Sequence, residues 1–413
     1  MDNEDSKASV DSSKNYIVSE AQLLAEKARR DKSERFKTHG EPIELPGKAL
    51  AFEVRGKHAW VGESTAVVRR LDLETGKTLQ LYKGHMGPVT TIAFYDVEGS
   101  EGQKLLISGS WDQSIKIWDS KTKQLLSTTK DAHSDFVKSL LVIPSLKLLV
   151  SGGSDKITRL WDLSSAGTSE PLKSAGSISS HTRPIECLAG YATSDSSAIL
   201  YTADTMGVLR VWTLQKEAGV KPPRWKCSPK GELTHHRTRI NDMALGQNLV
   251  WTASSDDTAQ IHSAIESEAS DVKLPKPLEH PTAVKAILPL PLTELGESYL
   301  LTVAGDYLRV YDISTLHEPE LVSTTDVHWH DATAIRLWFR HTKSESGEVT
   351  LVEPYIVTTS LDHSIRKWRL ADLLMPIPPP SLKPEPPKQE EPKTSTGMTE
   401  EEERELAELM GDD

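Results

Sequence analysis

Short runs of alternating apolar and polar residues recur along most of the chain and predict β-strands rather than helices. In residues 107–119, for example, Ile115 and Ile117 flank Lys116, so successive side chains would point to opposite faces of a strand. Glycine, serine and aspartate bound these runs, as tight turns between antiparallel strands require. The pattern predicts an all-β protein built from many short strands.

Two sub-patterns alternate along the sequence. The first is a histidine followed four residues later by Val or Ile, found at His85, His133, His181, His236 and His280, with a looser copy at His330. The second is a small-residue strand, a turn with aspartate and a strand ending in an aromatic-type residue, found at 107–119, 150–162, 200–212, 250–262, 300–312 and 356–368. Six histidines each precede one such segment, so the two halves form one unit. The separation of Trp118 and Trp161 fits the repeat of about 40–45 residues of a four-stranded propeller blade.

A seventh, degenerate unit precedes these six. Residues 49–54, 58–62 and 67–73 have the strand pattern without the histidine. At the other end, Trp368 is followed by a short apolar stretch and a proline-rich run, so the last unit lacks its outer strand. Residues 42–45 would supply that strand and leave no open sheet edge. We therefore expect a seven-bladed propeller over residues 41–372, with the ring closed by residues 42–45.

The units resemble WD repeats, with GH at 84–85 and WD at 118–119 and 161–162. The resemblance covers roughly residues 41–372 and implies a seven-bladed WD-repeat β-propeller with disordered or helical N- and C-terminal extensions. It also implies a buried hydrogen-bonded chain within each blade, which stabilises the fold when every member is satisfied. The matching side chains are His85, Ser108, Asp112 and Trp118 in one blade, and His133, Ser151, Asp155 and Trp161 in the next. In a further unit, Asp204 lies two residues further from its tryptophan, so that set matches less well.

The recurrence of the histidines at blade spacing favours a structural role over catalysis or metal binding. No HExxH, CxxC, GxSxG or phosphate-binding glycine loop is present, so we expect no catalytic, metal-binding or cofactor-binding residues, no cofactor and no enzymatic activity. The two cysteines, Cys187 and Cys227, have no metal-ligand spacing and indicate a reducing compartment. The polar N-terminus and the absence of a long apolar run predict an intracellular protein of the nucleus, the cytoplasm or both, without a membrane segment.

Protein partners are expected on the face that carries the histidine loops and the aspartate turns. The residues that differ most from blade to blade there are Met86, Trp111, Phe136, Arg183, Arg239 and Leu361. Tryptophan and arginine are enriched among interface hot spots, so an exposed Trp111 beside two arginines would accept a peptide with apolar and acidic groups. The alternative is that Trp111 packs against its neighbouring blade.

Two further hypotheses come from local motifs. Residues 106–121 resemble the motif by which some WD-repeat proteins dock on the adaptor of cullin-4 ubiquitin ligases, which would make Asp119 and Lys121 adaptor contacts and the protein a substrate receptor. Residues 19–37 are predicted to form a helix, and the basic residues within 27–37 would give weak RNA contact in ribosome or RNA maturation. A solvated helix face is the alternative. The net charge of −12 disfavours other nucleic-acid binding.

The chain ends complete the expected organisation. Residues 1–40 form a polar extension, residues 373–398 a proline-rich linker and residues 399–413 an acidic helix or peptide. In the last segment, Leu406, Leu409 and Met410 make a narrow apolar stripe of a kind that docks on a partner, although a merely solubilising tail is the alternative. The leading hypothesis is a non-enzymatic interaction scaffold, whose propeller face binds one protein and whose C-terminal peptide binds another.

Overall fold

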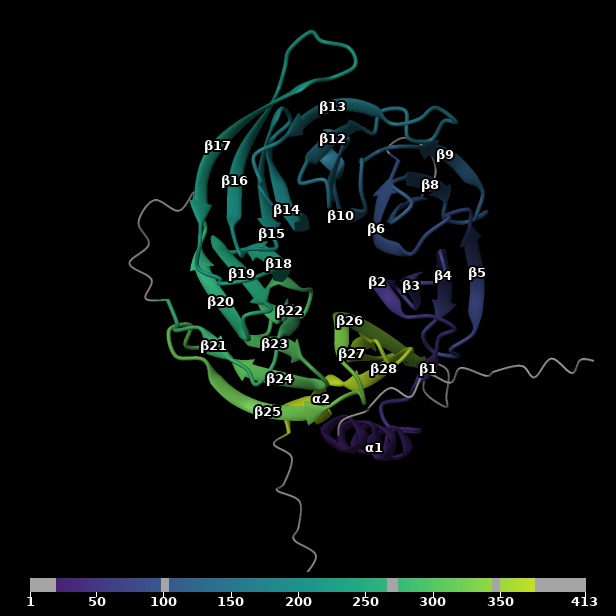
Figure 1. Cartoon of the computed structure of the whole chain (residues 1–413), viewed down its shortest axis with the longest axis vertical. Helices are drawn as coiled ribbons and strands as arrows, with labels where there is room; N and C mark the ends of the chain where they lie inside the picture. The colour runs from purple at the N-terminus through teal and green to yellow at the C-terminus, as the bar shows by residue number, and fades with distance from the viewer. Residues whose placement is uncertain (1–19, 98–103, 266–273, 344–349, 376–413) are drawn as a thin grey trace, which may run out of the picture. The chain divides into compact units, whose positions relative to one another are not determined.

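A computed structural model describes residues 20–97, 104–265, 274–343 and 350–375. Within these ranges the strands form seven four-stranded antiparallel sheets, which are arranged as blades around a common centre (Figure 1). The only α-helices of the described ranges are α1 (Glu20–Arg35) and α2 (Leu370–Leu374). The structure therefore confirms the seven-bladed, almost entirely β fold predicted from the sequence.

The first four blades follow chain order, each beginning at the centre of the ring (Figure 1). Blade 1 has β2 (Ala49–Arg55), β3 (His58–Glu63), β4 (Val67–Asp72) and β5 (Thr78–Lys83). Blade 2 has β6 (Val89–Asp96), β7 (Lys104–Ser110), β8 (Ile115–Asp119) and β9 (Leu125–Thr129). Blade 3 has β10 (Val137–Ile143), β11 (Leu148–Gly153), β12 (Thr158–Asp162) and β13 (Lys173–Ile178). Blade 4 has β14 (Ile185–Ser194), β15 (Ser197–Asp204), β16 (Leu209–Lys216) and β17 (Trp225–Leu233).

The remaining three blades complete the ring, and the last one borrows its outer strand. Blade 5 has β18 (Ile240–Gly246), β19 (Leu249–Ser254), β20 (Thr258–Ser263) and β21 (Leu278–Glu279). Blade 6 has β22 (Val284–Pro289), β23 (Tyr299–Ala304), β24 (Tyr307–Asp312) and β25 (Glu320–Asp326). Blade 7 has β26 (Ala332–Lys343), β27 (Thr350–Ser360), β28 (Ser364–Arg369) and, from the other end of the chain, β1 (Ile43–Glu44).

The ring is closed by the antiparallel pair of β1 and β28. Ile43 lies opposite Ile365, and the backbone N–H of Leu45 donates to the carbonyl of His363 at 2.7 Å. Ile43 and Leu45 are buried in the same apolar cluster as Ile365 and Trp338. This pairing occupies the ladder edge of β28 that would otherwise be open to another chain.

The hydrophobic core lies between neighbouring blades. Ile107 and Ile117 of blade 2 are fully buried against Val137 and Leu149 of blade 3. Ile107 and Ile117 lie opposite each other on β7 and β8, so their side chains share one sheet face. Burial of one such side chain contributes about 1.5–3 kcal/mol, so each blade is stabilised mainly by its neighbours.

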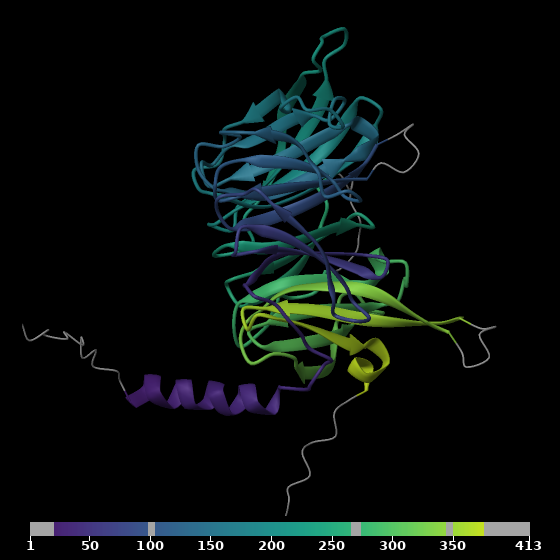
Figure 2. The same ribbon diagram turned by 90° about the vertical axis from the view of Figure 1, so that its right-hand side faces the viewer.

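The end of helix α1 is anchored to blades 6 and 7. Lys32 Nζ lies 2.5 Å from a carboxylate oxygen of Asp306 and of Asp326. The buried Phe36 follows the helix, and Arg366 donates to its carbonyl at 2.7 Å. Figure 2 shows the N-terminal part of α1 extending beyond the sheets, where Leu23 is exposed.

The C-terminal helix α2 packs on the propeller, because Leu373 is buried in the core cluster of blades 6 and 7 and its carbonyl accepts from Ser323 Oγ. The packed part of the chain therefore extends past residue 372. The predicted proline-rich linker beyond residue 375, the acidic peptide with Leu406, Leu409 and Met410, and residues 1–19 lie outside the described residues.

Candidate functional site

The buried network of blade 2 joins four side chains, two from the strands β7 and β8 and two from loops. His85 Nδ1 lies 2.8 Å from Asp112 Oδ2, and His85 Nε2 lies 2.8 Å from Ser108 Oγ. Trp118 Nε1 donates to the same Ser108 oxygen at 2.8 Å. Because an ionised carboxylate only accepts hydrogen bonds, His85 donates to Asp112 through Nδ1–H. Its other nitrogen, Nε2, accepts a hydrogen bond from the Ser108 hydroxyl. Burial alone would raise the pKa of Asp112, but hydrogen bonds from His85, Ser114 and the Met86 backbone lower it far below its ordinary value.

Blade 3 repeats this arrangement. His133 lies 2.9 Å from Asp155 and 2.7 Å from Ser151, and Trp161 donates to Ser151 at 2.9 Å. Burial would raise the pKa of Asp155, while the hydrogen bond and charge of His133 lower it on balance. The structure thus brings together all eight residues that the sequence predicts for these two blades.

Blade 4 contains a complete network in spite of its different spacing. His181 lies 2.9 Å from Asp204 and 2.7 Å from Thr202, and Trp212 donates to Thr202 at 3.0 Å. The turn after Asp204 bends so that the carboxylate also accepts from the backbone N–H of Met206 and Val208. The network therefore forms even though the aspartate lies further from the tryptophan in the sequence.

In blade 7 the assignment of the histidine from the sequence is wrong. The buried network uses His328, which lies 2.9 Å from Asp362 and 2.9 Å from Thr358, whereas His330 is partly exposed. The spacing of four residues from the histidine to the first strand is kept, but it ends at Ala332. A pattern that demands Val or Ile at this point misses His328 because alanine is small yet still fully buried there.

Blades 5 and 6 have incomplete networks. In blade 5, His236 contacts Asp256 at 3.0 Å and Thr252 at 2.8 Å, but His262 occupies the tryptophan position. In blade 6, His280 contacts Thr302 at 2.8 Å and has the Leu278 carbonyl in place of a carboxylate, at 2.9 Å. Burial lowers the pKa of His280 to about 4.

The order serine, histidine, aspartate in these networks matches the chemistry of a hydrolase triad, but their access to solvent does not. Ser108 and Ser151 are fully buried, and each serine oxygen is already bound by a tryptophan N–H. A nucleophile must reach its substrate. The networks therefore hold the blades together and do not form an active site.

The loops after the histidines and the aspartate turns lie on one face of the ring, which we call the loop face. Backbone hydrogen bonds join the two loops within a blade, from Trp111 to Pro88 at 3.0 Å and from Ser154 to Phe136 at 2.8 Å. The same contact joins Leu361 to Asp331 at 3.0 Å. In these three blades the third residue after the histidine is thereby held beside the residue that precedes the turn aspartate.

Three apolar side chains of the predicted partner surface lie together on the loop face. The Trp111 ring stacks on the Phe136 ring of the next blade, with centroids 4.7 Å apart and an interplanar angle of 15°. The stacked rings remain 41% and 37% exposed, and Met86, whose backbone N–H donates to Asp112 next to Trp111, is 90% exposed. Trp111 thus packs against the adjacent blade and still presents a large apolar surface to solvent.

The other predicted loop-face residues are distributed around the ring. Arg183 in blade 4 is exposed, and Arg239 in blade 5 lies 3.4 Å from Glu186. Glu186 also lies 3.6 Å from Lys138, which follows Phe136 by two residues. Leu361 is only half-exposed and belongs to blade 7, so blade 1 separates it from Trp111.

The predicted ligase-adaptor residues lie on the face opposite the loop face. Asp119 Oδ1 accepts from the backbone N–H of Lys121 at 2.9 Å and of Thr122 at 2.7 Å, so this carboxylate shapes the β8–β9 turn. The Lys121 side chain is exposed, and no carboxylate of the described ranges pairs with it.

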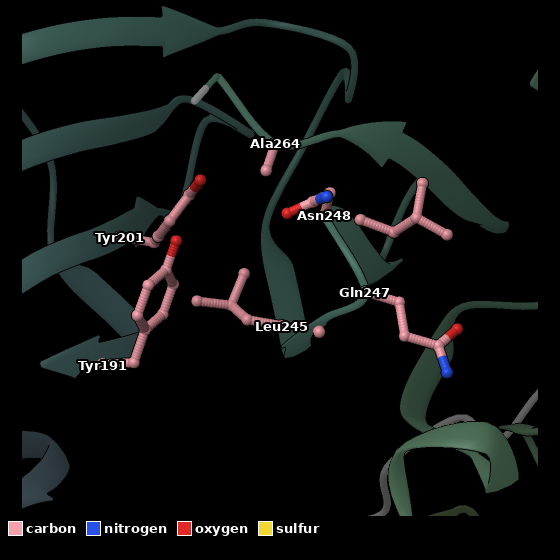
Figure 3. A pocket seen from close by; sticks show the side chains of 8 residues that line it. Tyr191, Tyr201, Leu245, Gln247, Asn248 and Ala264 are labelled. Carbon is pink, nitrogen blue, oxygen red and sulfur yellow. The ribbon is translucent and has the colours of Figure 1, made fainter. Parts of the chain in front are cut away.

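A cavity of about 320 Å³ lies between blades 4 and 5 and was not indicated by the sequence. Figure 3 shows Tyr191 and Tyr201 on one side of it and Leu245, Gln247 and Asn248 on the other. Its lining contains no charged side chain. Over the part of the chain that the structure describes, no group of three potential metal ligands occurs, and no helix is long and apolar enough to cross a membrane.

The fold and its repeated networks define a β-propeller of the repeat-protein class. The WD domain, G-beta repeat family matches residues 76–119 and 124–162, which comprise the last part of blade 1, blade 2 and part of blade 3. This match and the seven four-stranded blades together show a β-propeller that contains WD repeats.

The relatives of the chain share its repeats to very different extents. An uncharacterised WD repeat-containing protein of Schizosaccharomyces pombe is 28% identical over 412 residues, which cover 96% of this chain and 98% of that protein. A periodic tryptophan protein 2 homolog of the same yeast is 32% identical over 85 residues, 20% of this chain and 9% of that protein. The human peroxisomal targeting signal 2 receptor is 34% identical over 68 residues, 16% of this chain and 20% of that protein. The last two matches are local and show only that the repeat is shared.

Proposed function

We propose that this protein is a non-enzymatic scaffold that binds a segment of one protein partner on its loop face and a second partner through residues 399–413. The observation that carries the proposal is the stacked pair of Trp111 and Phe136 with Met86 beside it. Large exposed apolar side chains that lie together mark interaction surfaces. Propellers with WD repeats mediate protein interactions in general.

The charges on the loop face indicate the kind of segment that it binds. Arg183 is exposed and has no ion pair within the described residues, and Arg239 is held by Glu186 with its side chain still 45% exposed. An apolar residue of the partner would cover Trp111 and Phe136, and an acidic residue would meet the arginines. The partner is therefore a protein segment with both apolar and acidic side chains, in the nucleus or the cytoplasm.

The alternative of RNA binding through the basic helix receives less support. Lys32 is ion-paired with Asp306 and Asp326, and Lys37 lies 2.6 Å from Glu34. These lysines are partly neutralised and are not free to meet phosphates. The local similarity to a periodic tryptophan protein 2 homolog comes from repeats that many propellers share.

The test is quantitative affinity purification from native cells with four versions of the chain. The full chain is compared with Trp111→Ala, with Leu321→Ala and with a chain ending at residue 375. Leu321 is 51% exposed on the outer strand β25, so it controls for the loss of an exposed apolar side chain away from the loop face. We expect one set of stoichiometric proteins to be lost with Trp111→Ala alone and another with the truncation alone. Equal recovery from all four versions would contradict the proposal.

A further inference from the structure

A cavity of about 370 Å³ between blades 1 and 2 is lined by four cationic side chains and by no carboxylate. The cations are Arg55, Arg70, Lys104 and Lys121. We call this site the basic cavity. Such a concentration of positive charge is unexpected in a chain with a net charge of −12. Three other cavities that contain cations also contain Glu or Asp.

The cavity exists because blade 1 has a charged residue at a position of the blade interface that is apolar in most other blades. The strand registers place Arg70 where blade 2 has Ile117, a position that is apolar in blades 2 to 6. Blade 7 has Lys367 there, and this lysine is neutralised by Glu41 at 2.9 Å. Arg70 instead contacts Gln80 Oε1 at 3.1 Å and the His58 ring at 3.2 Å, and no described carboxylate pairs with it. A cation is thus held at a core-like position without its own counter-charge.

Aromatic rings fix the arginines in place. Arg70 lies over the Trp60 ring, with its Cζ 5.1 Å from the centroid, and Arg55 lies over the Phe94 ring at 4.1 Å. The two rings meet edge to face at 5.0 Å and are both buried. Each guanidinium is therefore preorganised by a cation–π contact, which reduces the entropy that a ligand must overcome.

The remaining groups compensate the positive charge only in part: the charge of Asp119 acts on Lys121 and that of Asp72 on His58, but neither carboxylate lines the cavity. Arg55 has one exposed ion pair, with Asp96 at 3.3 Å, and Lys104 and Lys121 have none within the described ranges. Burial and the charge of Arg70 lower the pKa of His58. This imidazole therefore adds hydrogen-bonding capacity and not a further charge at neutral pH.

We propose that the basic cavity binds the phosphate monoester of a phosphorylated serine or threonine in a protein partner. Such a group is a compact dianion with three acceptor oxygens, which suits guanidinium forks and lysines that converge on one cavity. A nucleic acid would need a basic track and open aromatic rings for stacking, but here the rings are covered by the arginines. A single cavity with converging cations favours a single phosphate.

This site is separate from the loop face, so the inference goes beyond the proposed scaffold function and does not rest on it. Strand β7 begins at Lys104, in the basic cavity, and ends at Ser110, beside Trp111. At about 3.3 Å per residue, the two sites lie about 20 Å apart. One propeller would hold an apolar segment on one face and a phosphorylated segment on the other.

The test titrates the full chain with a short peptide that carries one phosphoserine, with its unphosphorylated twin, with inorganic phosphate and with a short single-stranded RNA. Binding is followed by the NMR signals of the indole N–H groups of Trp60, in the basic cavity, and Trp111, on the loop face. The variant chain carries Lys104→Glu and Lys121→Glu, which are both exposed and therefore leave the fold intact. The control is Lys123→Glu, in the same turn as Lys121 but outside the cavity.

We expect the phosphopeptide to shift the Trp60 signal saturably, to leave Trp111 unchanged and to bind at least about tenfold more weakly to the double variant. The Lys123 variant should bind within about twofold of the natural chain. The proposal is overturned if the unphosphorylated twin binds as well, if inorganic phosphate binds but the phosphopeptide does not, or if the RNA binds more tightly through the same lysines. Loss of the Trp111-dependent partner would instead concern the scaffold function alone.

Discussion

The serine at the centre of the blade 3 network offers a direct test of what holds a blade together. Ser151 Oγ is fully buried, accepts from Trp161 Nε1 at 2.9 Å and lies 2.7 Å from His133 Nε2. Ser151→Ala removes only one oxygen atom, but it leaves the indole N–H and the imidazole nitrogen buried without partners. The side chains that lose a partner are themselves almost completely buried, so water cannot replace the hydroxyl.

The magnitude follows from those two orphaned groups. A buried polar group that loses its partner costs about 1–3 kcal/mol, so Ser151→Ala should lower the free energy of unfolding by about 2–6 kcal/mol. The matched control is Ser127→Ala, because Ser127 is also buried but its Oγ has no hydrogen-bond partner within the described structure. Removal of an unsatisfied hydroxyl should be neutral or slightly stabilising.

The assay is urea unfolding followed by tryptophan fluorescence and by far-ultraviolet circular dichroism. The midpoint for Ser151→Ala should fall clearly below that of the natural chain, while the midpoint for Ser127→Ala should not. Equal midpoints for the two variants would show that the network contributes no more than the bare apolar contacts of the blade, and would refute the reasoning.

Two further predictions concern acid stability and ring closure. Burial lowers the pKa of His280 to about 4, so between about pH 6.5 and pH 4 the unfolded chain binds a proton that the folded chain does not. The free energy of unfolding should therefore fall by about 3 kcal/mol as the pH is lowered from about 6.5 to about 4. The slope of the urea midpoint against pH should flatten in His280→Gln and remain as it is in His317→Gln, where the side chain is exposed; identical slopes would contradict this. Deletion of residues 1–45 removes the buried Ile43 and Leu45 and should lower the free energy of unfolding by about 3–6 kcal/mol. Urea unfolding would compare this chain with one that lacks only residues 1–19. Equal midpoints for the two truncations would argue against closure by β1.

The fold could be predicted because the repeat encodes it many times over. Alternating strands, turn residues and a recurring histidine are local signals. The six clear units allow the one degenerate unit to be assigned as a blade. The same redundancy led to the misassignment of His330, because the pattern tested the residue at the start of the next strand and not the burial of the histidine. Ala332 meets the same packing requirement with a smaller side chain.

The surface sites were only partly accessible from the sequence. Trp111 and Met86 interrupt a repeat, so they are visible as exceptions within one unit. The stack of Trp111 on Phe136 joins two blades, and such contacts depend on how the ring closes. The basic cavity was missed for the same reason, since Arg70 and Lys121 come from different blades and blade 1 had been treated only as a degenerate copy.

The pairing of β1 with β28 has a consequence for the synthesis of the chain. The ribosome produces Ile43 before any complete blade exists, yet its strand partner Ile365 is among the last residues of the propeller to emerge. Until then β1 has no strand to pair with, and the apolar side chains of Ile43 and Leu45 are not covered. A prematurely terminated product would keep both features. Ring closure thus reports that translation has reached the end of the propeller, and chaperones or proteases that recognise exposed strands can distinguish finished from unfinished copies.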